Sequence, residues 1–192
     1  MLTPRPDTVD FLLTRRSRPA KTLTAPAPDP VALKKILTAG LRVPDHGKLE
    51  PWHLLVLEGD ALARIADLTM SLGSARGHDP EKAEKAAFMF SGAPLIVAVV
   101  SAPVESDKIP EIEQILSAGA VCLSIVNAAL ALGWGANWLS GWTATDKEFL
   151  ASAFDLVPPA QVAGYIVLGT EGHAPPERPR PDLSAKVTHL LS

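Results

Sequence analysis

Two pairs of arginines are the residues of this sequence best suited to bind a charged ligand. Arg15 and Arg16 stand directly before Ser17, behind a short apolar segment. Guanidinium groups donate paired hydrogen bonds and a hydroxyl adds another, which suits a phosphate monoester. Arg178 and Arg180 form the second pair, and in an extended backbone their side chains point the same way. The pairs can meet at one phosphate only if the fold brings the chain ends together; otherwise each is an ordinary solvated surface pair.

Other reactive residue types do not form a recognisable site. His46 and His53 have no further ligand at metal spacing, so no metal site is expected. Cys122 lies in an apolar segment and is expected to be a core residue, unable to form a disulfide within one chain. The sequence GWGANW follows an expected helix and has Trp138 where a dinucleotide-binding loop needs a third glycine. A Rossmann site is therefore not expected.

Composition indicates a globular chain of one domain, residues 1–192. Hydrophobic residues make up 47% and charged residues 20% of the chain, with a net charge of −3. Lysines and arginines are scattered, so we expect no nucleic-acid partner. Pro4, Pro6 and Asp7 interrupt the segment where a signal peptide needs its apolar core. With only one cysteine, a reducing, cytoplasmic location is expected.

A long neutral segment raises the question of a membrane. No charged residue occurs between Glu113 and Asp146, but polar residues and GWGANW interrupt the segment. We expect a helix from about Pro110 to Leu132, buried in a core and packed on several sides, and no membrane span; a membrane-embedded protein is the alternative. The large apolar residues and one glycine fall on one stripe of this helix: Ile112, Ile115, Leu116, Gly119, Leu123, Val126 and Leu130.

The remaining pattern predicts irregularly alternating helices and strands. Further helices are expected just before the first arginine pair, from Pro30 to about Arg42, after a cap at Asp60, from Pro80 onward, and after a capping box at 145–148. Strands are expected at 52–59, 93–101, 135–142 and 164–170, with the second buried in the middle of a sheet. This order favours an α+β sandwich over a doubly wound sheet.

Taken together, these segments resemble the nitroreductase family of FMN-dependent NAD(P)H oxidoreductases, in particular its compact bacterial branch. The resemblance spans nearly the whole chain. It rests on RRS at 15–17, AGLRVPDHGKLEPWHLLVLEG at 39–59, APLIVAVV at 93–100, SAGAVCLSIVNAALALGWGANWLSG at 117–141, GYIVLGT at 164–170 and the RPR tail.

The resemblance implies a set of flavin-binding residues. By it, Arg15 and Ser17 hold the FMN phosphate with Arg16 beside them, and the arginines of the tail approach the same phosphate. It also implies that two residues of the 42–52 loop reach the flavin bound mainly by the partner subunit, and that three residues near 139 pass along the isoalloxazine ring. These additional residues are Arg178, Arg180, Arg42, His46, Trp138, Leu139 and Ser140.

One further segment resembles a region linked to NAD(P) binding, although its apolar helical character argues against direct contact. Its residues are Ala128, Ala129, Leu130, Ala131, Leu132 and Gly133. The chain departs from the wider family at Lys48 and Glu50, where Asn and Gln are usual, and at Leu139, where a relative has arginine. These departures bear on the electron acceptor and on the tuning of the flavin.

The resemblance also implies a fold and a reaction. The fold is a three-layer α+β sandwich with a mostly antiparallel sheet, forming a homodimer with FMN at the subunit interface. The reaction is ping-pong transfer of hydride from NADH or NADPH, through N5 of FMN, to a nitroaromatic, a quinone or a similar small molecule. The alternatives are a non-catalytic flavin-binding protein, and a reductive dehalogenase or flavin-modifying relative, which is expected to carry an added lid segment that this sequence lacks.

Overall fold

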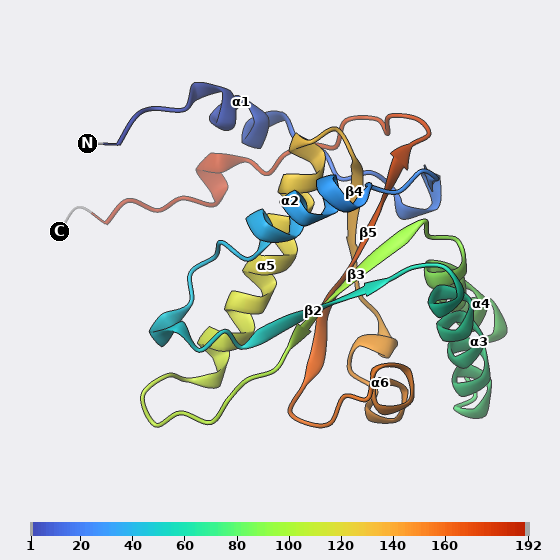
Figure 1. Ribbon diagram of the computed structural model, residues 1–192. Coiled ribbons are helices and arrows are strands. Elements are labelled where there is room, and N and C mark those ends of the chain that lie inside the picture. Colours follow the sequence, from blue (N-terminus) through green and yellow to red (C-terminus); the bar gives the residue numbers. More distant parts are fainter. Residues whose placement is uncertain (1, 191–192) are drawn as a thin grey trace.

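The computed structural model describes residues 2–190 and contains five strands and six α-helices (Figure 1). The strands are β1 (Leu23–Thr24), β2 (Trp52–Leu57), β3 (Leu95–Ser101), β4 (Gly135–Leu139) and β5 (Gln161–Glu171). The helices are α1 (Pro6–Thr14), α2 (Pro30–Gly40), α3 (Asp60–Ala75), α4 (Pro80–Ser91), α5 (Glu111–Ala131) and α6 (Lys147–Phe154).

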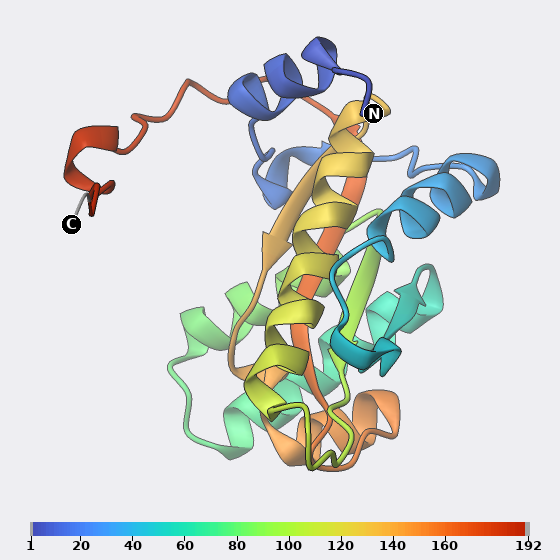
Figure 2. The same ribbon diagram turned by 90° about the vertical axis from the view of Figure 1, so that its left-hand side faces the viewer.

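Every strand pairing in the sheet is antiparallel. The strands follow the order β1-β5-β3-β2, and β4 pairs with β5 as well. All seven residues of β3 are buried, which confirms that this β-branched segment lies in the middle of the sheet. β4 has β5 as its only strand partner among the described residues, so it forms an edge, beside α5 in Figure 2.

Helices cover both faces of the sheet and produce three layers. Leu95, Val97 and Val99 pack with α2 and α5, whereas Ile96, Ala98 and Val100 pack with α3, α4 and α6. Because successive side chains of β3 point to opposite faces of the sheet, this strand contributes residues to both hydrophobic cores. This arrangement confirms the predicted α+β sandwich with a mostly antiparallel sheet.

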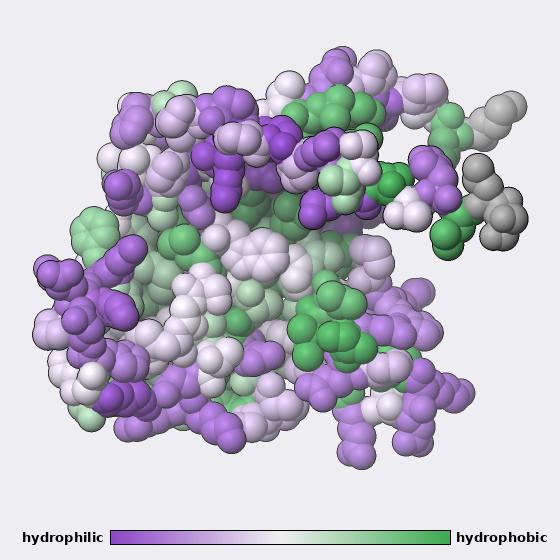
Figure 3. Space-filling view, turned by 180° about the vertical axis from the view of Figure 1, so that it is seen from behind, coloured by the Kyte–Doolittle hydropathy of each residue, from purple (hydrophilic) through white to green (hydrophobic). Residues whose placement is uncertain are grey.

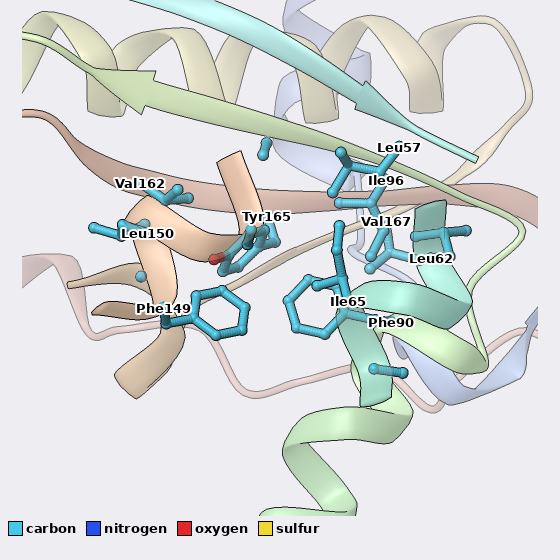
Figure 4. Packing of buried hydrophobic residues seen from close by; sticks show 14 of the residues in the cluster. Leu57, Leu62, Ile65, Phe90, Ile96, Phe149, Leu150, Val162, Tyr165 and Val167 are labelled. Atoms are coloured by element: carbon cyan, nitrogen blue, oxygen red, sulfur yellow. The ribbon is translucent and has the colours of Figure 1, made fainter. Parts of the chain in front are cut away.

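Aromatic rings fill the core beneath α3, α4 and α6 (Figure 4). The Tyr165 ring meets the Phe90 ring edge to face at 5.2 Å between centroids, and Phe90 stacks with Phe149 at 6.1 Å. The Tyr165 hydroxyl donates to the Thr143 carbonyl oxygen at 3.0 Å. Aromatic packing of this kind stabilises a core beyond the area that it buries.

Aspartates begin three of the helices. The carboxylates of Asp29, Asp79 and Asp146 accept from backbone N–H groups in the first turns of α2, α4 and α6. The predicted capping box at 145–148 is wrong, because Asp146 itself caps α6. The prediction that Asp60 caps α3 is also wrong, since Asp60 is already helical and Gly59 holds the cap position at φ 56°.

The expected packing of α5 is wrong for part of its surface. Ile112, Leu116 and Leu123 lie on the predicted stripe but are 58%, 65% and 46% exposed. The residues that face the sheet and α2 are mostly smaller: Gln114, Ser117, Ala118, Val121, Cys122, Ile125, Val126 and Ala129. Small residues allow a close approach, as at Gly40, where an added Cβ would overlap Ile125.

The same helix is long and apolar enough to cross a membrane. It nevertheless packs along α2, β3, β4 and β5, as a core helix does. Beyond β5 the tail is extended, as predicted, with one short turn at Leu183–Ala185. In Figure 1 the tail and α1 both project from the same side of the molecule.

Candidate functional site

The structure brings three of the four predicted phosphate-binding arginines together. Arg15 follows the last turn of α1, and its Nη2 donates to the Ser17 Oγ at 2.8 Å. The Arg180 guanidinium reaches across from the tail and donates to the Arg15 carbonyl oxygen at 3.3 Å. Arg16 completes what we call the arginine cluster: Arg15, Arg16, Ser17 and Arg180. The chain ends therefore converge, as phosphate binding requires.

Arg178 does not join this group by any side-chain contact in the described part of the chain. Its backbone N–H donates to the Glu177 carboxylate at 2.8 Å, and its side chain is exposed. Its predicted part in phosphate binding thus has no contact to support it. The Glu177 carboxylate also accepts from Arg180 at 3.0 Å, on the solvent side of the cluster.

The arginine cluster carries unbalanced positive charge. No carboxylate within residues 2–190 forms an ion pair with Arg15 or Arg16, and the Nε of each is buried without a hydrogen-bond partner. Burial lowers the pKa of Arg15, and the neighbouring charges of Arg180 and Arg16 lower it further. Buried donors without acceptors are costly in a folded protein. An anion bound here would relieve both costs.

The arginine cluster is followed by Arg18, which is attached to the N-terminal end of β4. The Arg18 N–H donates to the Ala136 carbonyl oxygen at 2.9 Å, and the Asn137 side-chain amide donates back to the Arg18 carbonyl oxygen at 2.5 Å. Arg18 itself pairs with Glu171 at 2.6 Å. These bonds fix the backbone that follows the cluster against the edge of the sheet.

The three residues expected beside the flavin ring lie at the other end of β4. Trp138 is 41% exposed, and its indole N–H donates to the Ala163 carbonyl oxygen at 3.3 Å. An added Cβ on Gly164 would overlap this indole, so the glycine allows the ring to lie flat on β5. Leu139 and Ser140 line a cavity of about 280 Å³ beyond it.

The two ends of β4 are separated by a distance suited to an elongated ligand. The four extended steps from Ala136 to Ser140, just beyond the end of β4, span about 13 Å. Figure 3 shows the molecule from behind, with neutral and hydrophobic side chains filling a band in the middle of this face and hydrophilic side chains above it. The arrangement offers cations for a phosphate at one end and an apolar surface for a flat ring at the other.

The loop with Arg42 and His46 connects α2 to β2. The His46 Nδ1 lies 2.7 Å from the Glu113 carboxylate, at the start of α5. The hollow beneath α1 is lined by Asn127, fourteen residues farther along α5, which corresponds to about 21 Å of helix. His46 is therefore far from this hollow, whereas Arg42 follows three residues after Ala39, which lines it. The approach of Arg42 and His46 to the partner's flavin stays a prediction.

Hydrogen bonds nevertheless hold this loop rigidly. The Asp45 carboxylate accepts from the N–H groups of Leu49 and Glu50 at 3.2 and 2.9 Å. Lys48 and Glu50, the two departures from the usual family residues, have left-handed backbones with φ 55° and 47°. Such conformations persist where the surroundings impose them and are frequent at binding sites.

The segment expected on the NAD(P) side forms the end of α5 and the turn after it. Ala128 and Ala131 line a hollow of about 430 Å³ between α5 and α1, and Ala129 is buried beneath them. Leu132 and Gly133 are exposed at the turn. Their predicted role stays a prediction.

Sequence reasoning missed three residues around the cavity beside Leu139. Lys82 and Lys85 of α4 line it together with Trp142. The spacing of the two lysines on one helical face was visible in the sequence, but nothing there indicated that α4 lies against the end of β4. Among the described residues, no three side chains of metal-ligating type form a cluster.

Comparison with known proteins decides the family. Residues 12–170 match the nitroreductase family. The chain belongs to this family. It is 37% identical over 164 residues to "Putative NAD(P)H nitroreductase YdjA" of Escherichia coli K12, covering 85% of this chain and 88% of that protein. The predicted family is thus confirmed.

Solved structures of similar fold agree with this assignment. The nitroreductase-like family protein from Bacillus cereus superposes with a TM-score of 0.80 at 19% identity, covering 100% of both chains. A nitroreductase with bound FMN from Bacteroides fragilis gives a TM-score of 0.73 at 18% identity, covering 96% of this chain and 98% of that one. At these identities the likeness shows the nitroreductase fold.

Proposed function

We propose that this protein is an FMN-dependent oxidoreductase that transfers hydride from NADH or NADPH to a nitroaromatic, a quinone or a similar small molecule by a ping-pong mechanism. In this proposal residues 1–192 act as one domain in the cytoplasm. The name of the relative YdjA and the FMN bound to the Bacteroides fragilis protein support the choice of reductant and cofactor.

The observation that carries the proposal is the arginine cluster at one end of β4. The Nε atoms of Arg15 and Arg16 are buried without a partner, and no carboxylate within residues 2–190 pairs with either side chain, which fits a phosphate monoester. The apolar edge of the same strand leads from this cluster to Trp138, Leu139 and Ser140. FMN has the matching parts in the same order, a phosphate, a linker and a flat ring.

The residues of the chain would bind and orient the cofactor and control access to it. Arg15, Arg16 and Arg180 neutralise the phosphate, while the Ser17 hydroxyl, already bonded to Arg15, is held in position to add a bond. The Trp138 indole, fixed by the Ala163 carbonyl, supports one side of the slot. When bound, FMN supplies hydride acceptance at N5 and electron transfer to a second substrate.

We further propose that two subunits form a homodimer with the flavin at their interface. Ile112, Leu116 and Leu123 expose large apolar side chains on one face of α5, and exposed apolar side chains gathered on one face commonly mark a protein contact. At one end of this surface, the loop with Arg42 and His46 is rigid and presents both side chains outward. In a dimer closed across α5, that loop would meet the partner's flavin.

The test is an anaerobic visible spectrum of the purified protein titrated with FMN and then with NADPH or NADH. Retention of FMN by the protein through gel filtration, and loss of the oxidised flavin band with either nucleotide, are the expected results. FMN with the nucleotide but without protein is the control. A bound flavin that stays oxidised would favour a non-catalytic flavin-binding protein, and failure to bind FMN would refute the proposal.

A further inference from the structure

A cavity next to the segment expected along the flavin ring has positively charged residues and no carboxylate in its lining. It lies between α4 and the segment that follows β4, and its volume is about 280 Å³. Its lining contains two ammonium groups and no carboxylate: Lys82, Lys85, Ala86, Met89, Leu139, Ser140, Gly141, Trp142 and Thr143.

The helical period of α4 directs its positive charges to this side. Lys82, Lys85 and Met89 follow one another at spacings of three and four residues, so they share a face. Glu81 and Glu84 are offset by one residue and do not line the cavity. Neither lysine forms an ion pair within the described chain.

Trp142 lines the cavity as well, but its indole donor is enclosed. Its indole Nε1 is buried and has no hydrogen-bond partner in the part of the chain that is described. The nearby Arg76 guanidinium lies 5.6 Å from the ring centroid, but its charge is balanced by Asp146 at 2.8 Å and Glu148 at 2.9 Å. The uncompensated charge around the cavity is therefore that of the two lysines.

We propose that this cavity binds the anionic group of the molecule that exchanges electrons with the flavin, either a carboxylate on a flat ring or the ribose 2′-phosphate of NADPH. The inference rests on the proposed function, because Leu139 and Ser140 belong both to the cavity and to the segment expected along the flavin ring. Lys82 and Lys85 attract the anion, and the apolar lining that includes Met89, Leu139 and Trp142 accommodates the rest of the molecule. The two lysines thus determine substrate choice and do not act on the flavin itself.

The experiment compares the double variant Lys82→Gln/Lys85→Gln with a matched control, Lys34→Gln/Lys35→Gln, whose lysines are exposed on α2. Binding of 4-nitrobenzoate and of neutral nitrobenzene to the oxidised, FMN-loaded protein is measured by calorimetry without any nucleotide. We expect the Kd for 4-nitrobenzoate to rise about tenfold in the double variant, as for the loss of two partly exposed ion pairs. Nitrobenzene binding should not change.

A second measurement, the KM for NADPH and for NADH, shows which molecule carries the anionic group. If the 2′-phosphate of NADPH is the ligand, the KM for NADPH rises about tenfold in the double variant while that for NADH, which lacks this group, does not, and 4-nitrobenzoate binding stays the same. If neither the 4-nitrobenzoate Kd nor the NADPH KM changes more than in the control variant, the proposal is wrong. Failure of flavin reduction would contradict the proposed function alone, because the calorimetric binding needs no turnover.

Discussion

Replacing Arg15 with alanine should weaken FMN binding and leave the stability of the FMN-free protein almost unchanged. In the FMN-free protein, Arg15 makes one side-chain hydrogen bond, to Ser17, and faces the charges of Arg16 and Arg180. Burial and these like charges lower the pKa of Arg15, which means that keeping the side chain charged costs free energy in the folded protein. A residue of this kind contributes little to the stability of the free protein and much to the binding of an anion.

The expected magnitudes follow from these contacts. Loss of the Ser17 hydrogen bond costs about 1 kcal/mol, and relief of the like-charge repulsion offsets part of it. The free energy of unfolding of the FMN-free Arg15→Ala variant should therefore stay within about 1 kcal/mol of the parent. A hydrogen bond to a charged phosphate contributes about 1.5–3 kcal/mol, so the FMN Kd should rise roughly 10- to 150-fold.

The assay is quenching of FMN fluorescence on titration with protein, together with urea unfolding of the FMN-free forms. Arg5→Ala is the matched control, since Arg5 is exposed and lies about 15 Å of helix away at the other end of α1. In the parent protein, higher salt should weaken binding. An Arg15→Ala variant that binds FMN within twofold of the parent, or that unfolds before FMN is added, would refute this reasoning.

Two other predictions concern the core. Tyr165→Phe removes the hydrogen bond to the Thr143 carbonyl and should lower the free energy of unfolding by about 1–2 kcal/mol. The Tm should fall by about 3–6 °C. An unchanged Tm would contradict the value given to this hydrogen bond. Burial raises the pKa of Cys122 to about 12, so the thiolate fraction at pH 8 is roughly 10⁻⁴, and Ellman's reagent should label the protein only after denaturant is added. Labelling of the native protein within minutes would show that Cys122 is accessible.

Much of the fold is predictable from local sequence because local rules decide it. The apolar β-branched segment at 95–101 predicts a central strand, and Asp-Pro pairs at 29–30 and 79–80 predict two helix starts, all of which the structure confirms. The failure at α6 is a choice between two neighbouring residues. Thr145 and Asp146 are both acceptable caps, and in the structure the Asp146 carboxylate accepts from the Phe149 N–H.

The orientation of α5 could not be predicted from its pattern. Its large residues Leu116 and Leu123 suggest the buried side by size alone, yet the helix packs on the sheet with a surface of mostly smaller residues such as Ala118 and Cys122. Hydrophobicity gives the free energy of burial per area but not the distance at which two elements pack. An apolar surface left outside by one chain is consistent with a second chain covering it.

For the candidate site too, some features follow from the sequence and others only from the tertiary structure. The sequence by itself predicted Arg15, Arg16 and Ser17 as a candidate phosphate-binding group, because these residue types can donate several hydrogen bonds to one phosphate. Only the tertiary structure decided that Arg180 joins them while Arg178 stays outside, and that Lys82 and Lys85 lie beside the end of β4. Contacts between residues more than fifty positions apart depend on how the layers pack, and no local pattern encodes that packing.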